Sequence, residues 1–503
     1  MRKKDFLVIF ISLIGMIELF LIGKSFYYHW LCMDHAEHLH ASWLVWQGNF
    51  PYRDFFEHHN PLLWYILAPV VALFYNNALI LYVSRFISVV AYVLLFFVFY
   101  KISNRFMKVS LKSFILAILI YFYIPDSYFL LTEMHPDVFM LLSYFIGIYY
   151  YYSYLDSKKQ KYLNISFIMF AISFLFLQKI LLVLFFTGMS ILYFIVKKDI
   201  NIKSVLKASI YPIVIIGVFI AWLYYNGALK IYYQLNYDLN LWMQHFMGDG
   251  KTSYSFHYAL YLPILSLFMI KNFLADKNKY KNIFIFIALL DYVLKPIVGA
   301  PYCQYYILNN LTASLVIGYY IIGHITQHKA KIIMVIMTII GFVVLNKFPQ
   351  NKIYPAYYQM NKYIYSQTNK DDVLISSINF INIYGKDASY YWFGLGNIAP
   401  VAYYLYMYQE PFVLKTLISK YKPKFIFYEP YENRILIDSR KNGNKKMFDE
   451  LSELWHILPV KREDKDSFIH RWSLRYYHTF DNSLILREYM PTPFMPPLIM
   501  RRH

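Results

Sequence analysis

Long apolar segments, separated by short basic loops, constrain this chain more than any other feature of its sequence. Of its 503 residues, 58% are hydrophobic and only 16% carry a charge. The apolar runs are about 17 to 25 residues long, which is the length that an α-helix needs to cross a bilayer. This composition excludes an ordinary soluble globular protein and indicates a multi-span membrane protein.

We predict an all-α polytopic membrane domain with eleven transmembrane helices. The predicted spans are residues 6–29, 78–100, 113–125, 136–154, 162–178, 180–196, 206–226, 255–270, 282–298, 305–323 and 331–347. The first span follows Arg2, Lys3 and Lys4 and lacks a small-residue cleavage site, so a retained helix is favoured over a cleaved signal peptide. An odd number of crossings places the two termini on opposite sides of the membrane.

The formal net charge of +19 is explained by the orientation of the chain in the membrane and not by a nucleic-acid partner. With a cytoplasmic N-terminus and alternating spans, 20 lysines and arginines fall in the inner loops and six in the outer ones. This asymmetry is the positive-inside rule. It predicts a multi-pass protein of the cytoplasmic membrane, with the lipid bilayer and not nucleic acid as its partner.

Two short helices are expected in the first outer loop, and a change of composition follows the last span. Residues 61–74 are apolar but short, and residues 34–48 end at a glycine, so both suit amphipathic helices on the outer surface. After residue 348 charges become frequent and apolar runs shorten. We predict a membrane domain at 1–347 and an extracytoplasmic soluble α/β domain at 348–503, with strands at 372–378 and 424–429 and helices at 411–421 and 445–455.

An acidic pair opens the first outer loop. Asp34 and Glu37 are three residues apart, so on a helix the two carboxylates share a face. Such a pair can take a proton from an attacking hydroxyl or amine, for a gain of about 10²- to 10⁴-fold in rate. Alternatively, Asp34 is only the cap of a helix and Glu37 a solvated side chain.

Further along this loop, Glu57, His58 and His59 precede a proline. A carboxylate beside imidazoles can position a phosphate or bind zinc or manganese. No tight ligand spacing such as His-Glu-x-x-His is present, and phosphate contact or loop hydrogen bonding is therefore favoured. We predict no resident cofactor, although the side chains would permit a divalent metal.

Other polar residues are expected at the outer ends of the spans. Isolated charges at membrane depth are costly and mark ion pairs or lipid-phosphate sites. The cations are Arg85, Lys179 and Lys295, and the remaining candidates are Glu133, Asp137, Gln304, Tyr305 and Tyr306. Asp137 follows a proline in a first helical turn, where a purely structural role accounts for it equally well.

Taken in order, these motifs resemble bacterial membrane glycosyltransferases of the GT-C fold. The similar branch is glycosyltransferase family 39, with the protein O-mannosyltransferases and the aminoarabinose transferase that modifies lipid A. The resemblance covers residues 1–347. It is carried by Asp34-His-Ala-Glu37, by residues 48–61 with Glu57, and by Arg85, Glu133, Asp137, Gln178-Lys179 and Gln304-Tyr305-Tyr306. The chain departs from the aminoarabinose enzyme at His58, where that enzyme has a lysine.

The resemblance implies transfer of a sugar from a polyprenyl-phosphate donor to an acceptor outside the cytoplasm, which is a glycan, lipid or protein of the cell envelope. Asp34 would be the base, with Glu37 beside it. Glu57, His58 and His59 would organise the donor, and Arg85, Lys179 and Lys295 would neutralise the lipid phosphate. The alternatives are a transporter or flippase of lipid-linked glycans, or a glycan polymerase. The absence of a visible internal repeat favours the enzyme.

Overall fold

The computed structural model describes most of the helical chain and several strands after residue 350. The described residues are 3–28, 33–124, 127–240, 278–298, 303–324, 353–376, 383–387, 390, 412–413, 425–428, 435–438 and 456–457. Helices dominate them, as the sequence predicts. The predicted spans 255–270 and 331–347 and the predicted helix 445–455 lie outside the described residues.

The chain divides into two compact units, and each unit combines three separate stretches of sequence. The first unit comprises Met1–His29, Ser84–Leu223 and Met247–Gln350, and the second comprises Trp30–Val83, Tyr224–Phe246 and Asn351–His503. The first outer loop therefore belongs to the same unit as residues from the C-terminal third. The predicted division into domains 1–347 and 348–503 stays a prediction.

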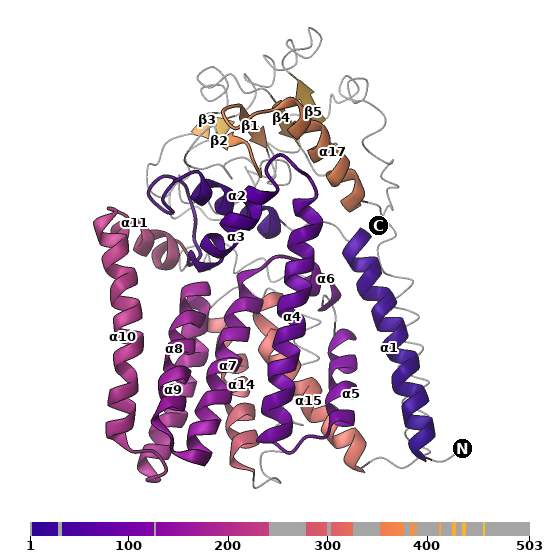
Figure 1. The fold of residues 1–503 in the computed structure, drawn as a ribbon, viewed down its shortest axis with the longest axis vertical. Helices are drawn as coiled ribbons and strands as arrows, with labels where there is room; N and C mark the ends of the chain where they lie inside the picture. The colour runs from indigo at the N-terminus through magenta and orange to yellow at the C-terminus, as the bar shows by residue number, and fades with distance from the viewer. Residues whose placement is uncertain are drawn as a thin grey trace. The chain divides into compact units, whose positions relative to one another are not determined.

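The first unit is helical wherever the structure describes it (Figure 1). Its helices are α1 (Lys3–Tyr28), α4 (Ile80–Arg105), α5 (Leu111–Phe122), α6 (Ser127–Thr132), α7 (Pro136–Ser157), α8 (Gln160–Phe176), η1 (Gln178–Ile180), α9 (Leu181–Val196), α10 (Ile202–Tyr225), α14 (Lys279–Val298), η3 (Cys303–Tyr306) and α15 (Ile307–His324). α4 and α10 each continue by a few residues into the second unit's sequence.

Within the described ranges, four helices are long and apolar enough to cross a membrane. They are Ile80–Arg105, Pro136–Ser157, Gln178–Val196 and Ile202–Tyr225. Each coincides with a predicted span. In α10 only 6% of the apolar window is buried. A helix that exposes so many apolar side chains is unfavourable in water and favourable in lipid, which indicates a membrane protein.

Two other predicted spans form apolar helices that are shorter than those four. Residues 113–125 become α5, which has 12 residues, and residues 162–178 become α8, which has 17. At 1.5 Å per residue α5 is about 18 Å long, against about 30 Å of hydrocarbon. α5 alone is thus too short for the crossing that the sequence predicted, because Tyr123 ends it before the short helix α6 begins.

Glycines allow two helix pairs of the first unit to approach closely. α7 packs against α8, and a Cβ atom at Gly147 would lie 2.5 Å from the Phe170 ring (Figure 1). α15 packs against α5, and a Cβ atom at Gly318 would lie 2.7 Å from the backbone oxygen of Ser113. Small residues at such contacts are typical of helix packing in membranes.

The second unit joins helices of the first outer loop to a small sheet. Its helices are α2 (Met33–Trp46), α3 (Leu62–Leu73), α11 (Leu229–Tyr233), the π-helical turn η2 (Gln234–Asp238) and α17 (Ile353–Gln367). α2 and α3 confirm the two helices predicted in that loop, and they pack against each other. Placement of these helices on the membrane surface stays a prediction.

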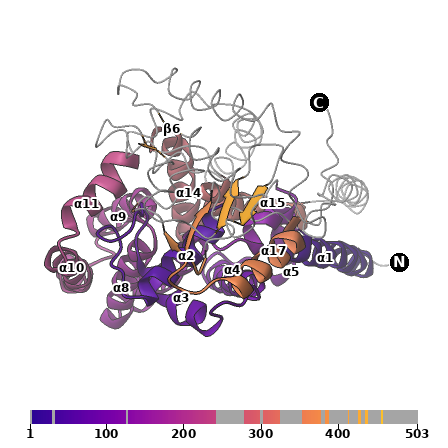
Figure 2. The same ribbon diagram turned by 90° about the horizontal axis from the view of Figure 1, so that it is seen from above.

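Four short strands form a mixed sheet in the order β2-β1-β4-β5. Figure 1 labels these strands, and Figure 2 shows the orange and yellow strands from above. The strands are β1 (Val373–Ser376), β2 (Lys386–Asp387), β4 (Phe425–Tyr428) and β5 (Ile435–Asp438). β1 runs parallel to β2 and β4, and β5 runs antiparallel to β4. β1 and β4 confirm the strands predicted at 372–378 and 424–429.

A second, antiparallel pair of strands corrects one expectation. β3 (Phe412–Val413) pairs with β6 (His456–Ile457), with Phe412 opposite Ile457. The sequence predicted a helix at 411–421, but these two described residues are extended because β6 supplies their hydrogen bonds. The pairing is long-range, which a local helical pattern cannot reveal.

Aromatic rings form the core that joins the first outer loop to the C-terminal segment in the second unit. Trp43 of α2 stacks on Tyr75 at 4.9 Å between ring centroids, and Tyr384 meets both rings edge-on. The Tyr384 hydroxyl donates to the backbone oxygens of Val71 and Phe74 at 3.2 and 2.7 Å. Edge-on and offset ring pairs add to the stabilisation that burial gives.

A buried ion pair holds three helices of the first unit together. Arg85 of α4 lies 2.9 Å from the Glu133 carboxylate, and neither side chain is exposed. Arg85 also donates to the backbone oxygens of Ser25 and Phe26 in α1, at 3.0 and 2.7 Å. Ser25 donates in turn to the backbone oxygen of Tyr128 in α6. Several hydrogen bonds are what a buried charge needs in order to be tolerated.

We expect Arg85→Met to lower the stability of the protein by about 3–5 kcal/mol, because it leaves Glu133 buried and uncompensated. Thermal unfolding in detergent would measure the loss as a lower Tm. Arg105→Met is the matched control, since that arginine bonds the Tyr149 hydroxyl at an exposed position. Adding Glu133→Gln to Arg85→Met should recover part of the loss, and an unchanged Tm in Arg85→Met would contradict the structural role.

Candidate functional site

The candidate site lies in the second unit, where α2 and the loop before α3 meet. α2 ends at Trp46, and Gly48 turns the chain with a φ of 87°. Asp54 then closes a tight loop, because its carboxylate accepts from the Phe50 amide at 2.7 Å. The loop continues through residues 57–60 into α3, which begins after Pro61. This path brings Glu57, His58 and His59 back beside α2.

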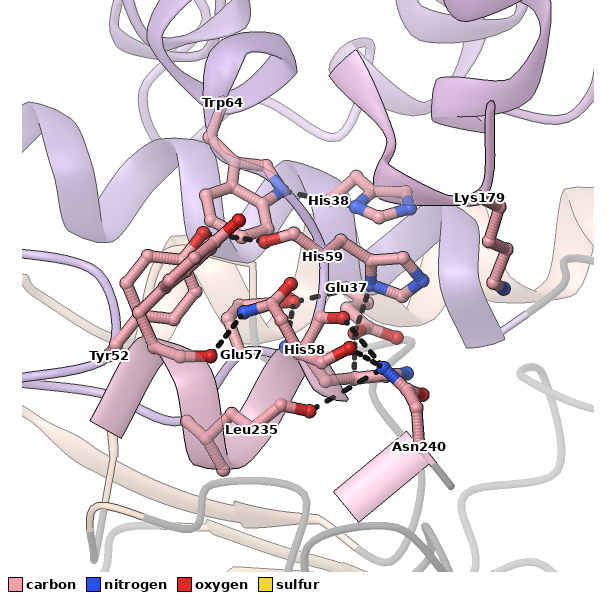
Figure 3. Close-up of polar contacts among 12 residues, drawn as sticks. Glu37, His38, Tyr52, Glu57, His58, His59, Trp64, Lys179, Leu235 and Asn240 are labelled. Carbon is pink, nitrogen blue, oxygen red and sulfur yellow. Dashed lines mark hydrogen bonds and ion pairs between the residues drawn. The ribbon is translucent and has the colours of Figure 1, made fainter. Parts of the chain in front are cut away.

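Four predicted residues meet there, as Figure 3 shows. One ligating atom from each of Glu37, Glu57, His58 and His59 lies within 4.8 Å of the others. The Nδ1 atoms of His58 and His59 are each 3.8 Å from Glu37 Oε1, and His59 Nδ1 is 3.4 Å from Glu57 Oε2. The two glutamates, 20 positions apart in the sequence, therefore share the His59 imidazole, and the His58 imidazole lies beside Glu37.

Burial sets the electrostatics of this cluster. Glu37 is 1% exposed and Glu57 is fully buried, while Asp34 is only partly buried at the start of α2. Burial raises the pKa of Glu57, and the negative charge of Asp34 raises it further, whereas hydrogen bonds from Glu37 and from the His58 and His59 amides oppose the shift. A carboxyl group with such a pKa holds a proton more firmly than a solvated one. The same site thus contains a partly exposed carboxylate and two buried carboxyl groups.

A third histidine and a tryptophan lie behind the cluster. Trp64 of α3 donates its indole proton to His38 Nδ1 at 3.1 Å, which makes that nitrogen an acceptor. The His38 ring then meets His59 edge-on at 5.2 Å and lies nearly parallel to the Trp64 ring. The contact fixes the orientation of His38 and supports the face of His59.

Tyrosine and asparagine side chains hold the backbone of the loop. The Tyr52 hydroxyl donates to the His59 oxygen at 2.6 Å, and burial raises the pKa of Tyr52, so that it stays a donor. Asn240 donates to the His58 oxygen at 3.5 Å (Figure 3). The Tyr232 hydroxyl donates to Asn60 Oδ1 at 2.9 Å. Tyr232 belongs to α11, and Asn240 follows η2.

Residues of the C-terminal third support the same region. His40 of α2 contacts both Asp387 oxygens through Nε2, at 2.9 and 3.0 Å, and the Ile383 oxygen through Nδ1 at 3.0 Å. Both ring nitrogens face oxygen atoms, so these contacts fix the orientation of the His40 ring. Tyr390 donates to the Tyr52 oxygen at 2.6 Å, and its own backbone oxygen accepts from the Phe56 amide. These long-range contacts were not predicted from the sequence.

The other predicted site residues belong to the first unit. Arg85 and Glu133 form the buried ion pair, and Asp137 lies buried in the first turn of α7 after Pro136 at its N-terminus. The Lys179 ammonium lies over the Tyr305 ring at 3.9 Å from its centroid and bonds the Tyr305 hydroxyl.

Lys179 is exposed, Gln304 and Tyr305 are partly buried, and Tyr306 is buried against Tyr292. Lys295 lies in α14, and its side chain is outside the described residues. Their parts in donor binding stay predictions.

No protein-family model matches the chain, and no curated protein matches it either. The resemblance to GT-C glycosyltransferases thus stays a prediction carried by the motifs, and the chemistry of the site follows from its own residues.

We expect Tyr52→Phe to destabilise the loop by about 1–3 kcal/mol, because it removes the donor to the buried His59 carbonyl while the ring remains. The measurement is the Tm in detergent. Tyr65→Phe is the matched control, since Tyr65 is 41% exposed. Equal Tm values for the two variants would show that the Tyr52 hydroxyl contributes nothing.

Proposed function

We propose that this chain is an integral membrane glycosyltransferase. It transfers a sugar from a polyprenyl-phosphate donor to an acceptor on the outer side of the cytoplasmic membrane. One observation carries the proposal more than the others: three carboxyl groups and two imidazoles gather in the loop that follows the first apolar helix. Hydrophobic proteins rarely concentrate ionisable side chains without a use for them.

Asp34 is assigned as the general base. It is partly exposed, so an acceptor can reach it, and it lies one helical turn before the buried Glu37. In the reaction the acceptor oxygen bonds to the anomeric carbon as the bond from that carbon to the phosphate oxygen breaks. Asp34 takes the acceptor's proton, and the polyprenyl phosphate leaves with the bonding electron pair.

Stabilisation of the leaving phosphate is assigned to the cations of the first unit. Charge neutralisation at the leaving oxygen lowers the barrier of a transfer in which negative charge develops there. Lys179 is the best candidate because its ammonium is exposed, while the Arg85 guanidinium already bonds Glu133 and two backbone oxygens. Tyr305 holds the Lys179 side chain by a hydrogen bond and a ring contact.

The eleven-span topology, the cytoplasmic N-terminus and the extracytoplasmic α/β domain at 348–503 belong to the same proposal. They place the first outer loop and the C-terminal residues on one side of the membrane. The contacts of His40 and Tyr52 with residues 383–390 support that common side, since residues in contact share a compartment. A transporter of lipid-linked glycans is the alternative, and it would move the donor without cleaving it.

We expect Asp34→Asn to lower sugar transfer by about 10²-fold or more while expression and Tm stay unchanged, because the amide cannot accept the proton. Transfer from a radiolabelled polyprenyl-phosphate sugar to cell-envelope acceptors is the measurement. Asp54→Asn, in the same loop but paired with Arg53, is the matched control and should remain active. Undiminished transfer by Asp34→Asn would remove the base assignment, and movement of intact donor without cleavage would support the transporter.

For Lys179→Ala we expect the apparent KM for the lipid-linked donor to rise by about tenfold, the loss typical of one charge-assisted hydrogen bond. The change should appear in KM for the donor and leave KM for the acceptor untouched. Lys203→Ala, at the start of α10 on the opposite predicted side, serves as the control. An unchanged donor KM would move the phosphate site elsewhere.

A further inference from the structure

The cluster of Glu37, Glu57, His58 and His59 has the composition of a metal site. Each residue offers one nitrogen or oxygen ligand, and the four atoms lie within 4.8 Å of one another. We propose that these four side chains bind one divalent transition-metal ion, and that zinc is the preferred ion. The proposal does not depend on the glycosyltransferase function, because binding is measured without any transfer reaction.

The distances between the side chains suit this assignment. Four ligands at about 2.0–2.1 Å from a tetrahedral zinc ion are separated from one another by about 3.3 Å. Three of the observed ligand-to-ligand distances are 3.4, 3.8 and 3.8 Å, and all involve a histidine Nδ1 atom and a glutamate oxygen. The other separations lie within 4.8 Å, so the longer ones must shorten to reach the tetrahedral spacing.

Charge favours a cation over an anion at this place. Two carboxylates approach each other at a buried position, with Asp34 near enough to act on Glu57 electrostatically. Like charges away from water are costly unless a positive charge lies between them. A dication offsets both carboxylates, whereas the phosphate contact suggested by the sequence would add negative charge to them.

The chemistry of the ligands selects among dications. Magnesium and calcium take oxygen ligands, and two imidazoles among four ligands disfavour both. Imidazole nitrogen with carboxylate oxygen suits zinc, and manganese less well. A short sequence motif does not reveal this site, because its ligands do not belong to one helix. Glu37 comes from α2 and the other three ligands come from the loop before α3.

Neighbouring residues would hold the ligands in place. Tyr52 and Asn240 bond the backbone oxygens of His59 and His58, and His38 supports the His59 ring. The His58 amide donates to Glu57 Oε2 at 3.0 Å. Contacts of this kind around a metal orient its ligands and are typical of a built site.

The first experiment measures metal binding by the full-length chain purified in detergent. The protein is washed with chelator, loaded with Zn²⁺, separated from free ion and analysed by elemental mass spectrometry. We expect one zinc ion per chain. X-ray absorption should find nitrogen and oxygen neighbours at about 2.0–2.1 Å, with the scattering of two imidazoles. A chain that retains no zinc, or zinc without imidazole neighbours, overturns the proposal.

Variants then locate the site. We expect Glu57→Gln and His59→Gln each to weaken zinc binding by at least about tenfold, since even residues that only orient a ligand change affinity by that factor. His135→Gln and Glu18→Gln are matched controls, because both residues are buried in the first unit. Calorimetric titration gives the affinities, and the Tm of each metal-free variant establishes that it is folded.

The pattern across variants decides the outcome. Weakened binding in Glu57→Gln and His59→Gln with unchanged binding in the controls supports the site. Equal affinity in the ligand variants and the wild type overturns it, as the zinc would then lie elsewhere on the chain. If either variant fails to fold, Co²⁺ loading of the wild type replaces it: a tetrahedral visible spectrum supports the site, and an octahedral one overturns it.

Discussion

The second unit depends on one physical constraint, the cost of keeping the carboxyl groups of Glu37 and Glu57 together and away from water. Buried charges persist only when partners compensate them. Here the His58 and His59 imidazoles lie beside the carboxyl groups and the His58 amide donates to Glu57, while Tyr52 and Asn240 hold the backbone of the loop. The first unit obeys the same constraint in a simpler way, since Arg85 and Glu133 neutralise each other and Arg85 Nη1 reaches two backbone oxygens.

Much of the local structure was predictable from the sequence. Apolar runs bounded by basic loops predicted α4, α7, α9 and α10, because the length and hydropathy of a span are properties of a single segment. The turn at Gly48 and the proline at position 61 likewise predicted where α2 ends and α3 begins. The predicted bounds were less accurate: α5 is Leu111–Phe122 and not 113–125, since hydropathy does not report where a helix begins and ends inside an apolar stretch.

Long-range contacts were not predictable in the same way. The sequence marked Arg85 for an ion pair or a lipid-phosphate site, but it did not identify Glu133, 48 positions away, as the partner. Asp387 lies 347 positions from His40, and Asn240 lies 182 positions from His58. Nothing periodic connects such residues, and only the folded chain shows that they meet. The ionisable residues of this loop were an intermediate case: Asp34, Glu37, Glu57, His58 and His59. Their composition marked them as a candidate site, but the sequence did not show how they lie relative to one another.

A cation at Glu37 and Glu57 would also clarify why the loop holds a third carboxylate. With both buried carboxyl groups engaged by the metal, neither could accept a proton from an acceptor hydroxyl. Asp34 is partly exposed and outside the four-ligand set, so it would remain the carboxylate available as a base. The metal and the base then have separate tasks, one holding the loop and the other receiving the proton. On this division of roles, loss of zinc should loosen the loop around residues 57–60 before it changes the chemistry at Asp34, because the metal links that loop to α2 and Asp34 belongs to α2 itself.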